Sequence, residues 1–125
     1  MPIRESGEMY LEAILVLSRR KAVVRSIDVG EYLQYSKPSV SRAMGILRRD
    51  GLIEMDRDGS LTLTDRGRAI AEMIYERHQV LTQVLMELGV EETVAAEDAC
   101  KMEHVISDTS FQAIKRHIER YEREK

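Results

Sequence analysis

The 125-residue sequence has no tryptophan, one cysteine and only two prolines. Aromatic residues make up 5% of it, so aliphatic side chains, methionine and alanine must form any core. One cysteine excludes an internal disulfide framework and predicts a cytoplasmic protein. No apolar run approaches the roughly 20 residues that span a bilayer, and the first ten residues lack the apolar stretch of a secretory signal. We therefore expect no membrane partner.

Charge, by contrast, is plentiful and unevenly distributed. Hydrophobic residues make up 43% and charged residues 33%, with a net charge of −3, which indicates a folded domain rather than a disordered tail. Residues 1–71 carry 12 Lys/Arg against 10 Asp/Glu, whereas residues 72–125 carry 7 against 12. This division permits a nucleic-acid-binding face in the amino half.

The amino half has the pattern of a helix-turn-helix unit. Apolar spacing predicts one helix over residues 7–20, a second that Ser26 caps, and a third with Pro38 in its first turn and a stop at Asp50-Gly51. The side chains that we expect this unit to bury are Ile27, Val29, Leu33, Val40, Met44, Ile46 and Leu47.

A β-hairpin is predicted directly after these helices. Apolar and polar residues alternate over 52–55 and 61–64, and the segment between them contains Asp58-Gly59, a turn signal. Any small helical domain can carry a helix pair and a hairpin. The order of these elements favours a winged helix.

Three further helices are predicted in the carboxyl half. They cover about 65–88 after a Thr64 cap, about 91–106, and a last segment capped by Ser107. The last helix has an apolar stripe formed by Phe111, Ile114, Ile118 and Tyr121. These helices exceed what a wing needs, so we expect them to form a second layer and a dimer surface.

Potential metal ligands gather near the end of the chain. Cys100, Glu103 and His104 are spaced i, i+3 and i+4, which places them on one face of the expected helix. Thiolate, carboxylate and imidazole all bind divalent metals. The alternative is a buried cysteine beside a solvated Glu–His pair. Met9 and Glu12 repeat the i, i+3 spacing, but a methionine at helical spacing is more often a core residue.

Several segments resemble the diphtheria toxin repressor family of metal-dependent transcription repressors, which includes manganese-sensing relatives. They are residues 8–12 (EMYLE), 37–42 (KPSVSR), 49–53 (RDGLI) and 98–108 (DACKMEHVISD). The resemblance implies a mainly α fold with a winged helix-turn-helix domain over 1–64. An α-helical metal-binding and dimerisation domain would follow over 65–125, in a short form without an SH3-like domain.

The resemblance also implies a set of metal ligands. Met9, Cys100, Glu103 and His104 match the activating site of the iron-sensing branch. Glu12 and His78 match positions that complete a two-metal site in the manganese-sensing branch. The set is a hybrid, because the manganese-sensing branch has Asp at the position of Met9 and Glu at that of Cys100. Thr82 and Ala96 replace a Glu and a His of the iron branch's ancillary site, so we do not expect that site in its usual form.

The candidate DNA contacts surround the start of the third predicted helix, which contains Pro38 and is the second helix of the helix-turn-helix pair. In related motifs, the start of this helix enters the major groove. Arg42 is the candidate base reader, whereas Arg25 and Arg57 are candidate phosphate contacts. We interpret Arg48 and Arg49 as ordinary solvated charges. The full candidate set is Arg25, Ser36, Lys37, Pro38, Ser39, Ser41, Arg42 and Arg57.

The function predicted from these features is a homodimeric, metal-activated repressor of metal-homeostasis genes that binds a palindromic operator in double-stranded DNA. Sulfur ligands favour Fe²⁺, with Mn²⁺ as the alternative and Co²⁺, Ni²⁺ or Zn²⁺ as substitutes in vitro. A second hypothesis is a winged-helix regulator that responds to a small molecule or to oxidation of Cys100 without metal. A metalloenzyme that uses Glu103 as a base is disfavoured, because HExxH, CxxC and GxSxG are absent. We expect no catalysis and no small organic substrate.

Overall fold

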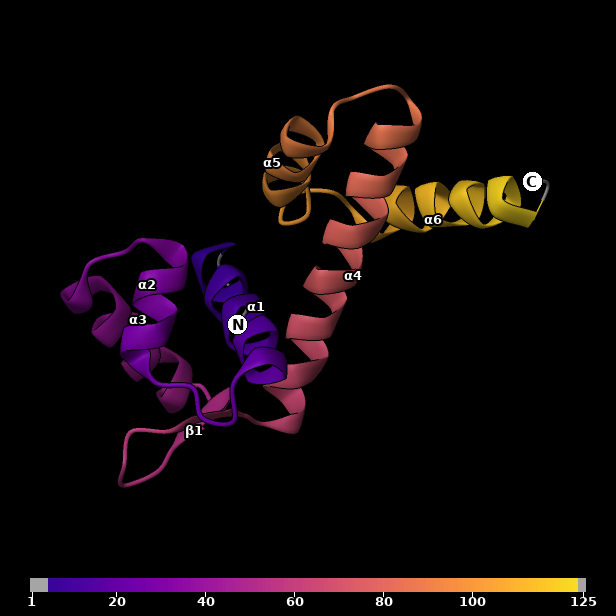
Figure 1. Cartoon of the computed structure of the whole chain (residues 1–125). Helices are drawn as coiled ribbons and strands as arrows, with labels where there is room; N and C mark the ends of the chain where they lie inside the picture. The colour runs from indigo at the N-terminus through magenta and orange to yellow at the C-terminus, as the bar shows by residue number, and fades with distance from the viewer. Residues whose placement is uncertain (1–4, 124–125) are drawn as a thin grey trace. The chain divides into compact units, whose positions relative to one another are not determined.

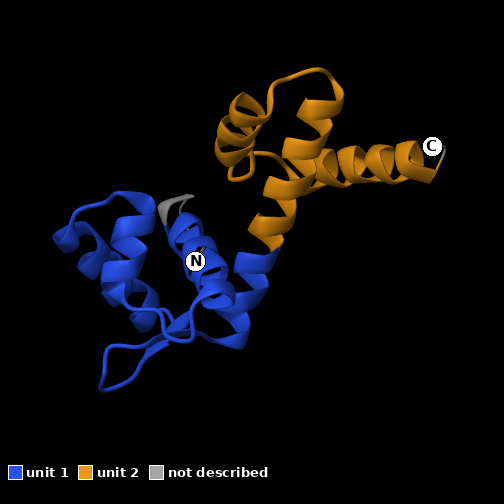
Figure 2. Ribbon diagram, viewed as in Figure 1, with its two compact units in different colours: residues 1–72 blue, residues 73–125 orange. Residues whose placement is uncertain are grey.

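The computed structural model describes residues 5–123 and is mainly helical, as the sequence predicts (Figure 1). The chain divides into two compact units, unit 1 (Met1–Glu72) and unit 2 (Met73–Lys125) (Figure 2). The elements are α1 (Glu5–Arg20), α2 (Ser26–Leu33), α3 (Lys37–Arg49), β1 (Ile53–Met55), β2 (Leu61–Leu63), α4 (Asp65–Glu87), α5 (Glu92–Met102) and α6 (Asp108–Arg123).

Unit 1 is a winged helix built around α1. The buried side chains of α1 include Leu11, Ile14 and Leu15, and both α2 and α3 pack on this helix. The strands β1 and β2 pair antiparallel with Ile53 opposite Leu63. Figure 1 shows the hairpin following α3, which confirms the predicted order of elements.

The start of α3 follows its sequence signals. Ser36 is the N-cap, and its hydroxyl oxygen accepts a hydrogen bond of 3.3 Å from the Ser39 N–H. Pro38 lies in the first turn, where a missing N–H leaves no helical hydrogen bond unmade. The chain turns away after α3 at Gly51, whose φ of +76° suits glycine.

The start of α2 and two core assignments differ from prediction. Arg25 is the N-cap and Ser26 the first helical residue, with the Arg25 N–H donating to Asp28 Oδ2 at 2.8 Å. Ile27 and Ile46 are 53% and 43% exposed, so the prediction that they are buried was wrong. Each lies next to the buried stripe of its helix rather than on it, and an apolar residue one step off that stripe points towards solvent.

The hairpin and the start of α4 are held by short contacts. Asp56 Oδ1 accepts hydrogen bonds of 2.9 Å from the N–H groups of Asp58 and Ser60, which fixes the turn. Thr64 caps α4 by accepting from the Gly67 N–H at 3.1 Å. A Cβ at position 67 would lie 2.0 Å from the carbonyl oxygen of Leu52, so the first turn of α4 requires glycine there.

Unit 2 contains the end of α4 together with α5 and α6. Gly89, with a φ of +102°, follows α4 as predicted. Ser107 caps α6 through the Ser110 N–H at 3.1 Å, and α6 buries Phe111. The predicted helix over 91–106 ends earlier, at Met102, so the next residues form a turn. Among residues 5–123, no helix is long and apolar enough to cross a membrane.

Candidate metal centre and nucleic-acid interface

Glu103 is the centre of the candidate metal site in unit 2. It is the C-cap of α5, keeps a right-handed helical backbone, and donates its N–H to the Ala99 carbonyl at 2.9 Å. Its side chain is fully buried. A buried carboxylate is costly unless hydrogen bonds or a cation compensate for its lost hydration. The groups that face this carboxylate therefore decide what the site can do.

Two imidazoles face the Glu103 carboxylate. His78, from α4, places Nδ1 2.9 Å from Oε2, and His104 places Nε2 3.3 Å from Oε1. Within the described part of the chain, Oε1 accepts no hydrogen bond of good geometry. One carboxylate with two imidazoles is a donor set that suits divalent first-row metals, including Fe²⁺ and Mn²⁺. The residues therefore fit a cation.

The helical-face argument for Cys100, Glu103 and His104 needs correction. Because α5 ends at Met102, only Cys100 lies on the helix, whereas Glu103 and His104 belong to the turn that follows. Cys100 is half-buried in the last turn of α5. The centre in unit 2 is thus carried by a helix end and a turn, with His78 supplied by a second helix.

Arg77 is a buried residue of this centre that the sequence did not reveal. It is 8% exposed, and its Nη1 donates to the carbonyl oxygens of Glu103 at 3.3 Å and Ile106 at 3.0 Å. Its guanidinium lies 5.5 Å from the centroid of the Phe111 ring. In the sequence, the one local indication that Arg77 belongs to this centre is its position directly before His78. An arginine beside a histidine in a helix is ordinarily exposed, so this indication is weak.

In unit 1, the candidate ligands Met9 and Glu12 lie half-buried on α1. The Met9 sulfur accepts a hydrogen bond of 3.0 Å from the Tyr35 hydroxyl, which comes from the turn between α2 and α3. A thioether sulfur is a weak acceptor, so a soft metal ion would compete with this hydrogen bond for the sulfur at only a small cost.

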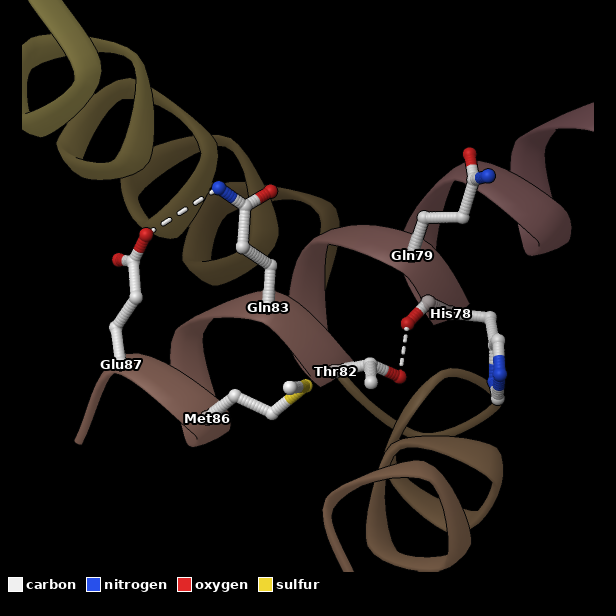
Figure 3. A pocket seen from close by; sticks show the side chains of 6 residues that line it. All are labelled: His78, Gln79, Thr82, Gln83, Met86 and Glu87. Atoms are coloured by element: carbon white, nitrogen blue, oxygen red, sulfur yellow. Dashed lines mark hydrogen bonds between the residues drawn. The ribbon is translucent and has the colours of Figure 1, made fainter. Parts of the chain in front are cut away.

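An open hollow runs along α4 in unit 2 (Figure 3). Its lining residues are His78, Gln79, Thr82, Gln83, Met86 and Glu87. The Thr82 hydroxyl donates to the His78 carbonyl at 2.7 Å, and Gln83 points to Glu87, with 3.3 Å between Nε2 and Oε1. Thr82 is thereby engaged with the backbone of its own helix. The side chain of Ala96 has no ligand atom.

The candidate DNA contacts on α3 share one exposed segment. Ser36, Lys37, Pro38, Ser39, Ser41 and Arg42 are all exposed. Gly45 lies one turn further along, and a Cβ built there would meet no atom of the described chain within 4 Å. The segment joins a helix N-terminus, which favours phosphate, to an arginine that can reach guanine N7 and O6.

The two wing-associated arginines differ in their surroundings. Arg57 is exposed in the hairpin turn. Arg25 donates from Nε to the carbonyl oxygen of Asp58 at 3.1 Å, so it braces the hairpin turn from the start of α2. Near it, the Lys21 ammonium and the Arg25 N–H hold the pKa of Asp28 below its ordinary value.

Two family models match the chain one after the other. Residues 3–61 match the family model described as the iron dependent repressor, N-terminal DNA binding domain. Residues 64–124 match the one described as the iron dependent repressor, metal binding and dimerisation domain.

Two curated relatives and one solved structure illustrate the similarity. The diphtheria toxin repressor of Corynebacterium efficiens is 33% identical over 105 residues, which cover 83% of this chain and 46% of that protein. The transcriptional regulator MntR of Escherichia coli O6:H1 is 35% identical over 112 residues, covering 90% of this chain and 72% of that protein. A manganese-dependent transcriptional repressor in complex with manganese has a TM-score of 0.82 and 27% identity, covering 89% of this chain and 51% of that one.

This chain spans about half the length of the diphtheria toxin repressors that it matches. It covers 72% of the MntR sequence at 35% identity, and the two family models together account for nearly every residue. The chain therefore belongs to the diphtheria toxin repressor and manganese transport regulator family of metal-dependent transcriptional repressors.

Proposed function

We propose that this protein represses metal-homeostasis genes when a divalent cation, Fe²⁺ by preference, occupies a site around Glu103. The single observation that carries the proposal is the fully buried Glu103 carboxylate held between two imidazoles. A cation there would compensate for the lost hydration of the carboxylate, which neutral imidazoles do only in part.

The proposed ligands are His78, Cys100, Glu103 and His104, together with Met9 and Glu12, which the family resemblance implies. The histidines and carboxylates suit Fe²⁺ and Mn²⁺ alike, whereas the sulfur atoms of Cys100 and Met9 favour Fe²⁺ over Mn²⁺. Mn²⁺ is the alternative ion, and Co²⁺, Ni²⁺ or Zn²⁺ would replace Fe²⁺ in vitro. A bound cation would supply positive charge that compensates for the buried Glu103 carboxylate, and no catalysis is proposed.

The proposed DNA-binding domain, residues 1–64, binds through the exposed segment Ser36–Arg42 and the hairpin. Ser36, Lys37, Ser39 and Ser41 contact phosphates around the start of α3, and Pro38 shapes that start. Arg42 reads a base, and Arg57 contacts a phosphate beside the groove. Arg25 contributes by bracing the hairpin turn as well as through its charge.

The partner proposed for residues 65–125 is a second copy of the chain. Amphipathic α6 buries Phe111 and Ile118 but leaves Tyr121 45% exposed, and Val105 and Leu88 are 67% and 76% exposed in the same unit. Apolar surface of this kind suits an isologous two-fold interface, which in turn suits a palindromic operator. We expect a dimer by sedimentation velocity at micromolar concentration with metal present, and a monomer under those conditions would contradict it.

The deciding experiment is anaerobic DNA binding to a palindromic promoter fragment. The full chain is titrated without metal, with Fe²⁺ and with Mn²⁺, and metal content is measured in parallel. Tight binding only with metal supports the proposal. Equal binding in the absence of metal would instead favour a regulator that responds to a small molecule or to oxidation of Cys100.

A further inference from the structure

We propose that Arg77 is a positioning residue that sets the geometry and affinity of the metal centre, an inference that rests on the proposed function. Arg77 does not offer a ligand atom. It acts on the turn that carries Glu103 and His104, and every contact used in the argument lies within unit 2.

Arg77 binds backbone carbonyl groups at and just after the end of α5. The last carbonyls of a helix lack helical partners and carry partial negative charge. Arg77 Nη1 donates to two carbonyl oxygens of this region, those of Glu103 and Ile106. The two carbonyls flank His104, so one guanidinium fixes both ends of the short turn that contains this histidine.

Arg77 lies on the same helix, α4, as the proposed ligand His78. It precedes His78 on α4, and His78 Nδ1 lies 2.9 Å from Glu103 Oε2. The same helix turn therefore supplies an imidazole and the arginine that holds the backbone of the turn carrying the facing carboxylate. The distance between these two ligand groups depends on the bonds of Arg77 to the Glu103–Ile106 turn.

Two residues of α6 hold the Arg77 side chain in place. The Phe111 ring, at 5.5 Å from the guanidinium, and Asp108, at 3.7 Å from Nη2 to Oδ1, confine the side chain from the first turn of α6. A buried guanidinium with this many fixed partners does not reorient freely. Lysine at this position would keep the charge but not the planar fork, and methionine would lose every donor.

The test compares Arg77→Met, Arg77→Lys and the control Arg68→Met in the full-length protein. Arg68 is an exposed arginine of the same helix that forms a salt bridge with Glu72, outside the metal centre. Mn²⁺ affinity is measured by titration, and the absorption spectrum of bound Co²⁺ reports ligand geometry. We expect Arg77→Met to weaken Mn²⁺ binding about 10- to 100-fold and to change the Co²⁺ spectrum, as loss of a supporting residue typically does.

We expect the Mn²⁺ affinity of Arg77→Lys to lie between those of Arg77→Met and the native protein. The Mn²⁺ affinity and Co²⁺ spectrum of Arg68→Met should match those of the native protein. A purely structural role would lower the unfolding temperature without moving the Mn²⁺ affinity or the Co²⁺ spectrum, and that result in Arg77→Met overturns the proposal. If Arg77→Met does not fold, native affinity and spectrum in Arg77→Lys overturn it. Failure of the native protein to bind either ion would contradict the proposed function as well. If the native protein binds metal and the Arg77 variants bind it equally well, only the role of Arg77 is contradicted.

Discussion

The Tyr35 hydroxyl donates a hydrogen bond to the sulfur of Met9 at 3.0 Å. Tyr35 also packs edge-on against Tyr10, with 5.8 Å between ring centroids, and it directly precedes Ser36, the N-cap of α3. A proposed metal ligand on α1 is thus bonded to the residue beside the start of the DNA-reading helix.

This bond makes a specific prediction for Tyr35→Phe. Phenylalanine keeps the ring contact with Tyr10 but removes the hydroxyl that would compete with the proposed metal ion for the Met9 sulfur. A neutral hydrogen bond contributes about 0.5–1.5 kcal/mol, and sulfur is at the weak end. We expect Fe²⁺ and Mn²⁺ affinity to rise roughly 2- to 5-fold, measured by anaerobic titration.

The matched control for Tyr35→Phe is Tyr32→Phe, which removes a hydroxyl from a tyrosine of α2 whose ring lies 6.0 Å from the Arg20 guanidinium. This control should leave metal affinity unchanged. Unchanged or weaker metal binding in Tyr35→Phe would show that Met9 does not exchange the hydroxyl for a metal ion.

A second prediction concerns the base reader. Arg42→Ala should weaken binding to the cognate operator by about 1–3 kcal/mol while leaving binding to random DNA much less affected, because a bidentate contact to guanine discriminates among bases. The control is Arg49→Ala, an exposed arginine near the end of the same helix. Equal losses on both DNAs at fixed salt would assign Arg42 to a phosphate contact.

Metal preference is tested by the double substitution Met9→Asp and Cys100→Glu. It replaces two soft sulfur donors with oxygen donors, and oxygen suits Mn²⁺. We expect the response in DNA binding to shift towards Mn²⁺ in anaerobic titrations of each ion. Strong activation of the native protein by Mn²⁺ at free concentrations where Fe²⁺ does nothing would contradict the preference for Fe²⁺.

A fourth prediction concerns pH and the start of α2. Asp28 accepts hydrogen bonds from the Lys21 ammonium at 2.5 Å and from the Arg25 N–H, and its pKa is lowered from 3.8. Asp28→Ala should reduce the free energy of unfolding by about 0.5–1 kcal/mol at neutral pH, as loss of a partly exposed capping contact does.

The sign of its pH dependence follows from linkage. Because the folded pKa of Asp28 is depressed, its contribution is full above the unfolded value near 3.8 and is lost as pH falls through the lower folded value. Urea unfolding across this range should show the native and Asp28→Ala proteins converging in acid. A constant difference between them would show that the ionised carboxylate contributes nothing.

Local signals predicted the parts of the fold that depend on local contacts. Pro38 marked the start of α3, Thr64 and Gly89 bracketed α4, and Asp58-Gly59 located the hairpin turn. Each of these residues acts on backbone groups within a few positions, so its effect is readable from a short window.

The sequence predictions were wrong or incomplete where the structure depends on contacts between residues far apart in the sequence. The periodic pattern continued to residue 106, but the carbonyls of Glu103 and Ile106 bond to Arg77 from another helix, and α5 ends at Met102. The burial of Ile27 and Ile46 depends on which helix faces meet, and composition does not determine that. Likewise, spacing suggested Glu103 and His104 as ligands, but only the fold shows His78 Nδ1 beside the Glu103 carboxylate.

The two glycines at positions 45 and 67 mark opposite limits for engineering. Gly67 is fixed by the Leu52 carbonyl, so any side chain there must displace the Leu52 backbone, which directly precedes β1. Gly45 has room for a side chain in α3, one turn after Arg42. We therefore expect a library of side chains at position 45 to be tolerated without disturbing the hydrophobic core, and to change operator choice if α3 reads DNA as proposed.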